Sequence, residues 1–132
     1  MNIEMIIEVT DLDEKLTKDF VTFCCKELDI SPSQIGVEGW PEPLKNNALG
    51  LCYNVTEDEY LIMVSTRGRT LTEIYNTIAH ELIHVKQYEK DDLDVSMAAY
   101  KPAYDDRWWE IEAREKSLDL VKKYVDILTE LV

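Results

Sequence analysis

The chain holds its two histidines four residues apart, in the segment His80-Glu81-Leu82-Ile83-His84. Residues four apart share one face of a helix, so both imidazoles can reach a single ion. Zinc binds imidazole nitrogen readily, and a catalytic zinc site usually has three protein ligands and one open position. The glutamate that follows the first histidine is placed to act as the general base toward a water on the ion. The spacing therefore predicts a Zn2+ site with His80 and His84 as metal ligands and Glu81 as a catalytic residue.

The third ligand has to be Glu, Asp or Cys, because the chain has no further histidine. The best candidates lie in the segment Trp108–Arg114, which contains Glu110 and Glu112. At 100° per residue, Glu110 aligns with an inward, mostly apolar stripe of a C-terminal helix, whereas Glu112 aligns with a charged stripe and is predicted to face solvent. A carboxylate on a core face is costly unless it is paired or binds a metal. We therefore predict Glu110 as the third ligand; the alternative is a carboxylate that accepts hydrogen bonds from backbone N–H groups at the start of the helix.

Short strands are predicted from the periodicity of the apolar residues. Residues 2–9 are apolar and β-branched and predict a strand, and two apolar segments joined by polar residues predict a β-hairpin with arms Leu49–Val55 and Tyr60–Ser65. A loop rich in proline and glycine over residues 31–47 leaves room for a short strand at Ile35–Glu38. Strands that are few and grouped predict a small antiparallel or mixed sheet.

Three helices are predicted, of which the second carries both histidines and the third carries Glu110. Apolar residues continue round more than one side of the second helix, which predicts burial between layers. Its start has the T-x-x-E spacing of a capping box, in Thr70 and Glu73. We expect a single α+β domain over residues 1–132, with the sheet packed on the second helix and on the C-terminal helix. The predicted helix bounds are Thr10 or Asp11 to about Leu28, Thr70 to about Tyr88, and Asp105 or Asp106 to the C-terminus.

Composition excludes several classes of protein. The chain has 132 residues, 14 basic and 27 acidic side chains, and a formal net charge of −13. A protein this acidic lacks the basic face that binds nucleic acid or an anionic membrane. We therefore expect neither as a partner. The three cysteines Cys24, Cys25 and Cys52, without a recognisable signal peptide, predict free thiols in a reducing, cytoplasmic setting. We expect a monomer or a weak dimer.

The segments HELIHVKQYE and WWEIEAR resemble those of small gluzincin-type zinc metallopeptidases. The likeness is nearest to the minimal versions, the minigluzincins, and to short metallopeptidases carried by phages and prophages, and it covers roughly residues 60–120. The resemblance implies a minimal zincin-like fold in which His80, His84 and Glu110 hold zinc and Glu81 is the base and the proton shuttle. It also implies an edge strand just before the active-site helix, here Tyr60–Ser65, to which a substrate peptide adds by backbone pairing.

The chain departs from the family pattern near the C-terminal helix. Many gluzincins support the glutamate ligand with Asp or Asn at the position of Arg114, and relatives commonly have proline at the position of Trp108. Gluzincins often stabilise the oxyanion with His or Tyr. Since no histidine remains, Tyr100, Tyr104 and Arg107 are the candidates for this catalytic role, and simple packing is the alternative for each tyrosine.

These observations together predict a zinc-dependent metalloendopeptidase whose substrate is a peptide or a protein. The main alternative is a zincin-fold protein of a mobile element, catalytically weak or inactive, that serves as a binding or regulatory module. Hydrolysis of a non-peptide amide or ester at the zinc site is a further alternative.

Overall fold

The structure is a computed structural model that describes residues 4–7, 12–91, 93 and 107–130. Its class is α+β, as the sequence predicts. None of the helices within these residues is long and apolar enough to cross a membrane. In chain order the elements are β1 (Glu4–Ile7), α1 (Glu14–Leu28), β2 (Gln34–Trp40), the short 3-10 helix η1 (Lys45–Asn47), β3 (Gly50–Thr56), β4 (Glu59–Ser65), α2 (Leu71–Lys90) and α3 (Trp108–Glu130).

The strands form one mixed sheet in the order β1-β2-β4-β3. β2 pairs in parallel with both β1 and β4, whereas β3 pairs antiparallel with β4. The mixed sheet is confirmed. The strand expected at Ile35–Glu38 is longer and spans Gln34–Trp40, because buried residues alternate with more exposed ones over nearly its whole length.

The place of β4 in the sheet differs from the edge position expected for Tyr60–Ser65. β4 has a hydrogen-bonded neighbour on each side, so its backbone groups are already paired. The strand at the end of the sheet next to β4 is β3, whose first three residues are half-buried and whose last four are exposed. The sequence does not decide between the arms, since either arm of a hairpin can pair with a third strand.

Capping bonds define where the first two helices begin. Asp13 caps α1, and its carboxylate accepts a hydrogen bond of 2.9 Å from a backbone N–H in the first turn. The predicted cap at Thr10 or Asp11 is therefore wrong. The capping box of α2 is confirmed, because the Thr70 hydroxyl accepts from the Glu73 N–H at 3.1 Å and the Glu73 carboxylate accepts from the Thr70 N–H at 2.9 Å. The caps expected for the last helix, Asp105 or Asp106, lie outside the described residues.

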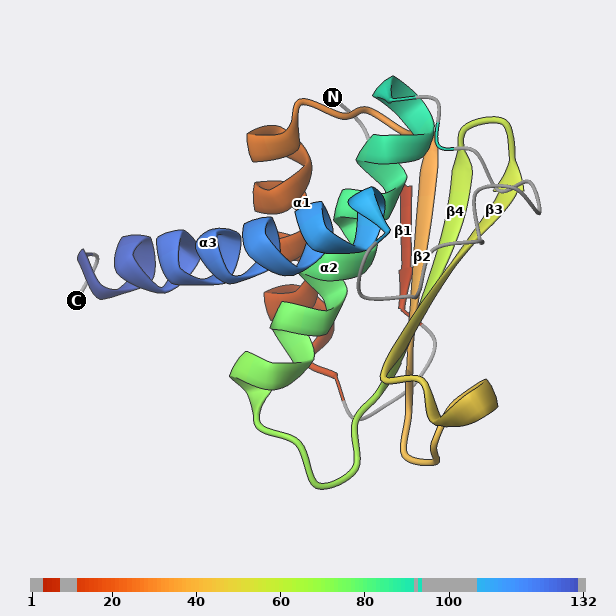
Figure 1. The fold of residues 1–132 in the computed structure, drawn as a ribbon. Helices are drawn as coiled ribbons and strands as arrows, with labels where there is room; N and C mark the ends of the chain where they lie inside the picture. Colours follow the sequence, from red (N-terminus) through yellow and green to blue (C-terminus); the bar gives the residue numbers. More distant parts are fainter. Residues whose placement is uncertain (1–3, 8–11, 92, 94–106, 131–132) are drawn as a thin grey trace.

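Helix α2 lies at the centre of the molecule. The helices cover one face of the sheet, and α2 contacts α1, α3, β3 and β4 (Figure 1). Between Ile78 and Val85 every side chain of α2 is buried except that of His80, which is half-buried. The expected burial between layers is confirmed, and it means that each polar side chain in this stretch needs a partner.

Candidate metal centre

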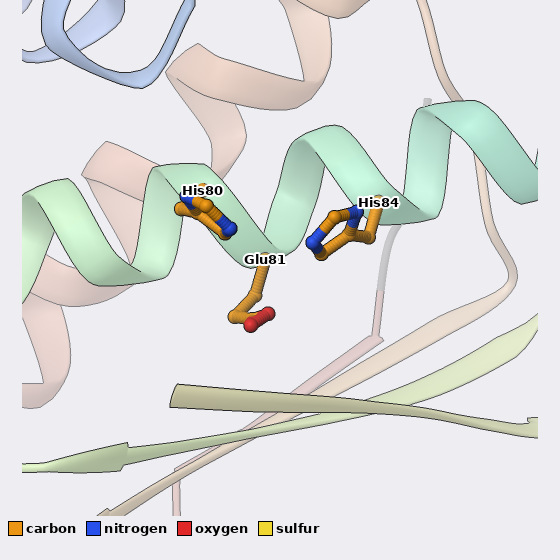
Figure 2. A group of neighbouring side chains, drawn as sticks. All are labelled: His80, Glu81 and His84. Atoms are coloured by element: carbon orange, nitrogen blue, oxygen red, sulfur yellow. The ribbon is translucent and has the colours of Figure 1, made fainter. Parts of the chain in front are cut away.

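Two turns in the middle of α2 present the histidines and the glutamate between them. Figure 2 shows the carboxylate of Glu81 projecting from α2 toward the strands, with the rings of His80 and His84 on either side of it. One donor atom from each of the three side chains lies within 4.8 Å of the others. The side chains of this group therefore have the donor atoms and the spacing to hold a metal ion.

Glu110 brings a fourth donor to this group from the first turn of α3. Its Oε1 lies 2.9 Å from Nε2 of His80 and 3.0 Å from Nε2 of His84, so a single oxygen sits between the two imidazole nitrogens. Glu110 is only 7% exposed, which agrees with the inward direction derived from the helical count. The structure thus brings together all three side chains for which the sequence predicts metal binding, from two helices that are separate in the chain.

Charge within this group is redistributed by burial and by these contacts. Burial raises the pKa of Glu81, and the nearby histidines only partly oppose it. Burial also favours the neutral form of His84, but the hydrogen bonds to Glu110 and Gln87 and the charges of Glu81 and Glu110 together outweigh it and raise the pKa of the imidazole. For Glu110 burial opposes ionisation, yet the bonds to His80 and His84 hold its pKa well below the ordinary value. Without metal, the site is a carboxylate paired with imidazoles that compete for it.

The carboxylate of Glu81 has one oxygen with no protein partner. Glu81 is 6% exposed, and among the described residues no group donates a hydrogen bond to its buried Oε2. An unpartnered buried carboxylate oxygen is costly in a purely structural side chain. Such an oxygen beside two imidazoles fits a group that acts on a bound water or substrate.

Strand β3 passes close over Glu81 because residue 50 is glycine. A Cβ at Gly50 would lie 2.5 Å from Cγ2 of Thr77 and 3.2 Å from Cγ of Glu81, closer than ordinary contact allows. Two hollows open on either side of this crossing, and both are lined by Gly50 and Glu81. Because these lining residues are shared, the two hollows adjoin at the candidate site, and we refer to them together as the cleft.

The two halves of the cleft differ in chemistry. The half beside His84 and Glu110 measures about 310 Å³, and its other walls are mostly apolar and aromatic. The half beside His80 measures about 610 Å³, and its walls include Asn46, Asn76 and Thr77. An extended chain that crosses Glu81 would therefore meet apolar walls on one side and amide and hydroxyl groups on the other.

Of the three side chains predicted from the sequence to stabilise the oxyanion, one lies within the described residues. Arg107 lines the apolar half of the cleft together with Glu81 and Glu110. Tyr100 and Tyr104 lie outside the described residues. Arg114 and Trp108, where the chain departs from the gluzincin pattern, are exposed.

The prediction that Glu112 faces solvent is wrong. Its side chain is 24% exposed and accepts hydrogen bonds from Nε2 of Gln87 at 3.0 Å and from Nζ of Lys86 at 3.3 Å. An ion pair of 3.3 Å with Lys116 adds to these. The projection at 100° per residue placed Glu112 correctly on the charged stripe of α3. The first turns of α3 lie against α2, however, so this part of the stripe contacts α2 rather than solvent.

Gln87 belongs to the site, and the sequence analysis did not identify it. Its side chain is fully buried, with Oε1 2.7 Å from Nδ1 of His84. Its Nε2 donates to the backbone oxygen of Trp109 at 2.8 Å and to Glu112 at 3.0 Å. The signal that could have found it is the spacing of three residues after the second histidine, which places both side chains on one face of α2.

No match is found when the chain is compared with models of protein families, with characterised proteins and with solved structures. The resemblance to gluzincins therefore stays a prediction, and the case for a function depends on the geometry of the site.

Proposed function

We propose that the protein is a zinc-dependent metallopeptidase, with His80, His84 and Glu110 as the ligands. The observation that carries this proposal is one carboxylate oxygen that lies within 3.0 Å of each of two imidazole nitrogens, beside the unpartnered oxygen of Glu81. Two nitrogens and one oxygen are a donor set that suits zinc in a catalytic site. The residues present therefore fit the ion.

Glu81 is the general base in this proposal. A bound zinc ion supplies Lewis-acid chemistry, because it acidifies water and polarises a carbonyl oxygen. Glu81 takes the proton from the attacking water and returns it to the nitrogen of the leaving amine, so the peptide C–N bond breaks and water is consumed. The raised pKa of its buried carboxyl suits a group that must both accept and donate a proton.

The polypeptide substrate is placed by strand β3 in this proposal, rather than by the strand Tyr60–Ser65. Among the described strands, β3 lies at the end of the sheet, and it crosses the site at Gly50, so an extended peptide would pair with its outer edge. Arg107, in the wall of the cleft, is a positive group within reach of the developing oxyanion, and Tyr100 and Tyr104 stay candidates for the same role.

The test combines metal analysis with cleavage of an unstructured protein. We expect one zinc per chain in the wild type and its loss in His80→Ala. Cleavage should be abolished in Glu81→Gln with zinc retained, and unaffected in Glu115→Gln, a matched control at an exposed position of α3.

Other outcomes would overturn the proposal. A wild type that binds no zinc has no metal centre. A wild type that binds zinc, cleaves no member of a peptide library, and binds a protein partner as well as Glu81→Gln does would be a binding module rather than an enzyme. Hydrolysis of only small amides or esters would favour non-peptide chemistry.

A further inference from the structure

We propose that Gln87 is a positioning residue that holds His84 in the tautomer with the proton on Nδ1, and so keeps Nε2 available to a metal ion. The inference rests on the proposed metal site and extends it to a side chain that does not touch the ion. It is carried by a buried chain of hydrogen bonds that links both helices of the site.

The orientation of the Gln87 amide is determined by its surroundings. Its nitrogen faces two acceptors, the backbone oxygen of Trp109 at 2.8 Å and the carboxylate of Glu112 at 3.0 Å. A rotation of the amide by 180° would set its oxygen against both of these oxygens, and neither could donate. The amide oxygen must therefore face Nδ1 of His84, at 2.7 Å.

This orientation fixes which nitrogen of His84 keeps its proton when the other nitrogen binds a metal ion. An amide oxygen only accepts, so Nδ1 has to donate. Nε2, which faces Glu110 at 3.0 Å, is then the nitrogen whose lone pair a metal ion would take. Without metal, the Glu110 carboxylate also only accepts, so it competes with Gln87 for the one proton of the neutral ring. Metal-binding histidines usually donate their other ring N–H in this way, which orients the ring and raises its basicity.

The same amide also positions the other helix of the site. Trp109, whose backbone oxygen accepts from Gln87, immediately precedes Glu110 in the chain. Glu112, the second acceptor, is held by Lys86 of α2 and by Lys116 of α3. One fully buried side chain therefore orients a ligand on α2 and ties down the turn of α3 that carries the third ligand.

The experiment compares Gln87→Met with Gln34→Met, which alters the other glutamine of the chain, on β2. Zinc affinity is measured by competition with a chromogenic chelator, using zinc alone. The tautomer of His84 is read from the ring 15N shifts of the metal-free protein in a Glu110→Gln background, at a pH where the ring is neutral, so that no carboxylate competes with Gln87 for the ring proton. We expect Gln87→Met to weaken zinc binding by about 10- to 100-fold and to move the proton of His84 toward Nε2. Gln34→Met should match the wild type in both measurements.

A rescue variant separates positioning from packing. Gln87→Glu combined with Glu112→Gln keeps the size of both side chains. A protonated, buried carboxyl at position 87 donates its O–H to the backbone oxygen of Trp109 and accepts from Nδ1 with its other oxygen, and the amide at position 112 removes the neighbouring carboxylate. We expect this double variant to recover the Nδ1–H tautomer and part of the affinity. If Gln87→Met does not fold, the double variant still tests whether the side chain at position 87 orients His84.

Three results would overturn the inference. They are wild-type affinity in Gln87→Met, weakened affinity with an unchanged tautomer, and a folded double variant with the proton on Nε2. Failure of the wild type to bind zinc would instead refute the proposed function, and the tautomer of the metal-free protein would still decide the role of Gln87.

Discussion

Replacing Gly50 with alanine should push strand β3 away from helix α2. The new Cβ would lie 2.5 Å from Cγ2 of Thr77, which is 0.9 Å less than the 3.4 Å at which ordinary contact begins. Thr77 cannot simply turn away, because its hydroxyl donates to the backbone oxygen of Glu73 at 3.2 Å and accepts from Arg69. The contact of 3.2 Å with Cγ of Glu81 brings the strain directly to the side chain proposed as the general base.

We expect Gly50→Ala to lower the free energy of unfolding by about 1–3 kcal/mol, the usual cost of overpacking. The proposed cleavage rate should fall by a larger factor than the loss of folded protein accounts for, because an outward shift of β3 changes the position of Glu81 relative to the substrate proposed to bind on that strand. Urea unfolding followed by circular dichroism measures the first effect, and initial rates at saturating zinc measure the second.

A second substitution tests whether the methyl group of Thr77 is the cause. Thr77→Ser keeps the hydroxyl and removes Cγ2, so the double variant Gly50→Ala, Thr77→Ser should recover most of the lost stability, while Thr77→Ser alone costs little. The reasoning is refuted if Gly50→Ala is as stable as the wild type, or if the double variant is no more stable than Gly50→Ala.

Three further predictions concern metal, capping and pH. Zinc at about 100 times its Kd should stabilise the wild type by about 2.7 kcal/mol, measured as a rise in Tm that a chelator reverses; an equal rise in His84→Ala would contradict the ligand assignment. Thr70→Ala removes the hydroxyl that caps α2 and should lower the free energy of unfolding by about 0.5–2 kcal/mol; no change in urea unfolding would show that the capping box adds nothing. Burial raises the pKa of Glu81 above its ordinary value of 4.5, so the folded protein keeps this proton at a pH where the unfolded chain has released it. Metal-free wild type should therefore lose stability relative to Glu81→Gln as the pH rises above 4.5, and a constant difference between about pH 4 and about pH 8 would contradict the raised pKa.

The sequence predicts those parts of the fold that depend on neighbouring residues. The capping box of Thr70 and Glu73 lies within one turn, so its residues identify it without knowledge of the rest of the chain. The hairpin formed by β3 and β4 also follows from local alternation and a polar turn. The cap of α1 was missed because several acidic residues follow one another there, and only the backbone conformation at Asp13 selects one of them.

The edge strand of the sheet and the environment of Glu112 could not be predicted from local patterns, because both depend on distant parts of the chain. Which arm of the hairpin lies at the edge depends on β2, whose residues pair with residues of β4 that lie 25 positions further along the chain. The environment of Glu112 depends on where α3 crosses α2, and the helical count alone contains no information on that crossing.

The amino-acid sequence by itself determined the donor atoms and the faces from which they project. Two imidazoles four residues apart must share a helix face, and the register of Glu110 within an amphipathic helix directs it inward, since both follow from 3.6 residues per turn. Only the tertiary structure decided that these faces meet, that β3 is the strand crossing Glu81, and that Gln87 joins His84 to the start of α3. Such contacts arise from packing between elements far apart in the chain, where shape and burial select the partners and periodicity no longer does.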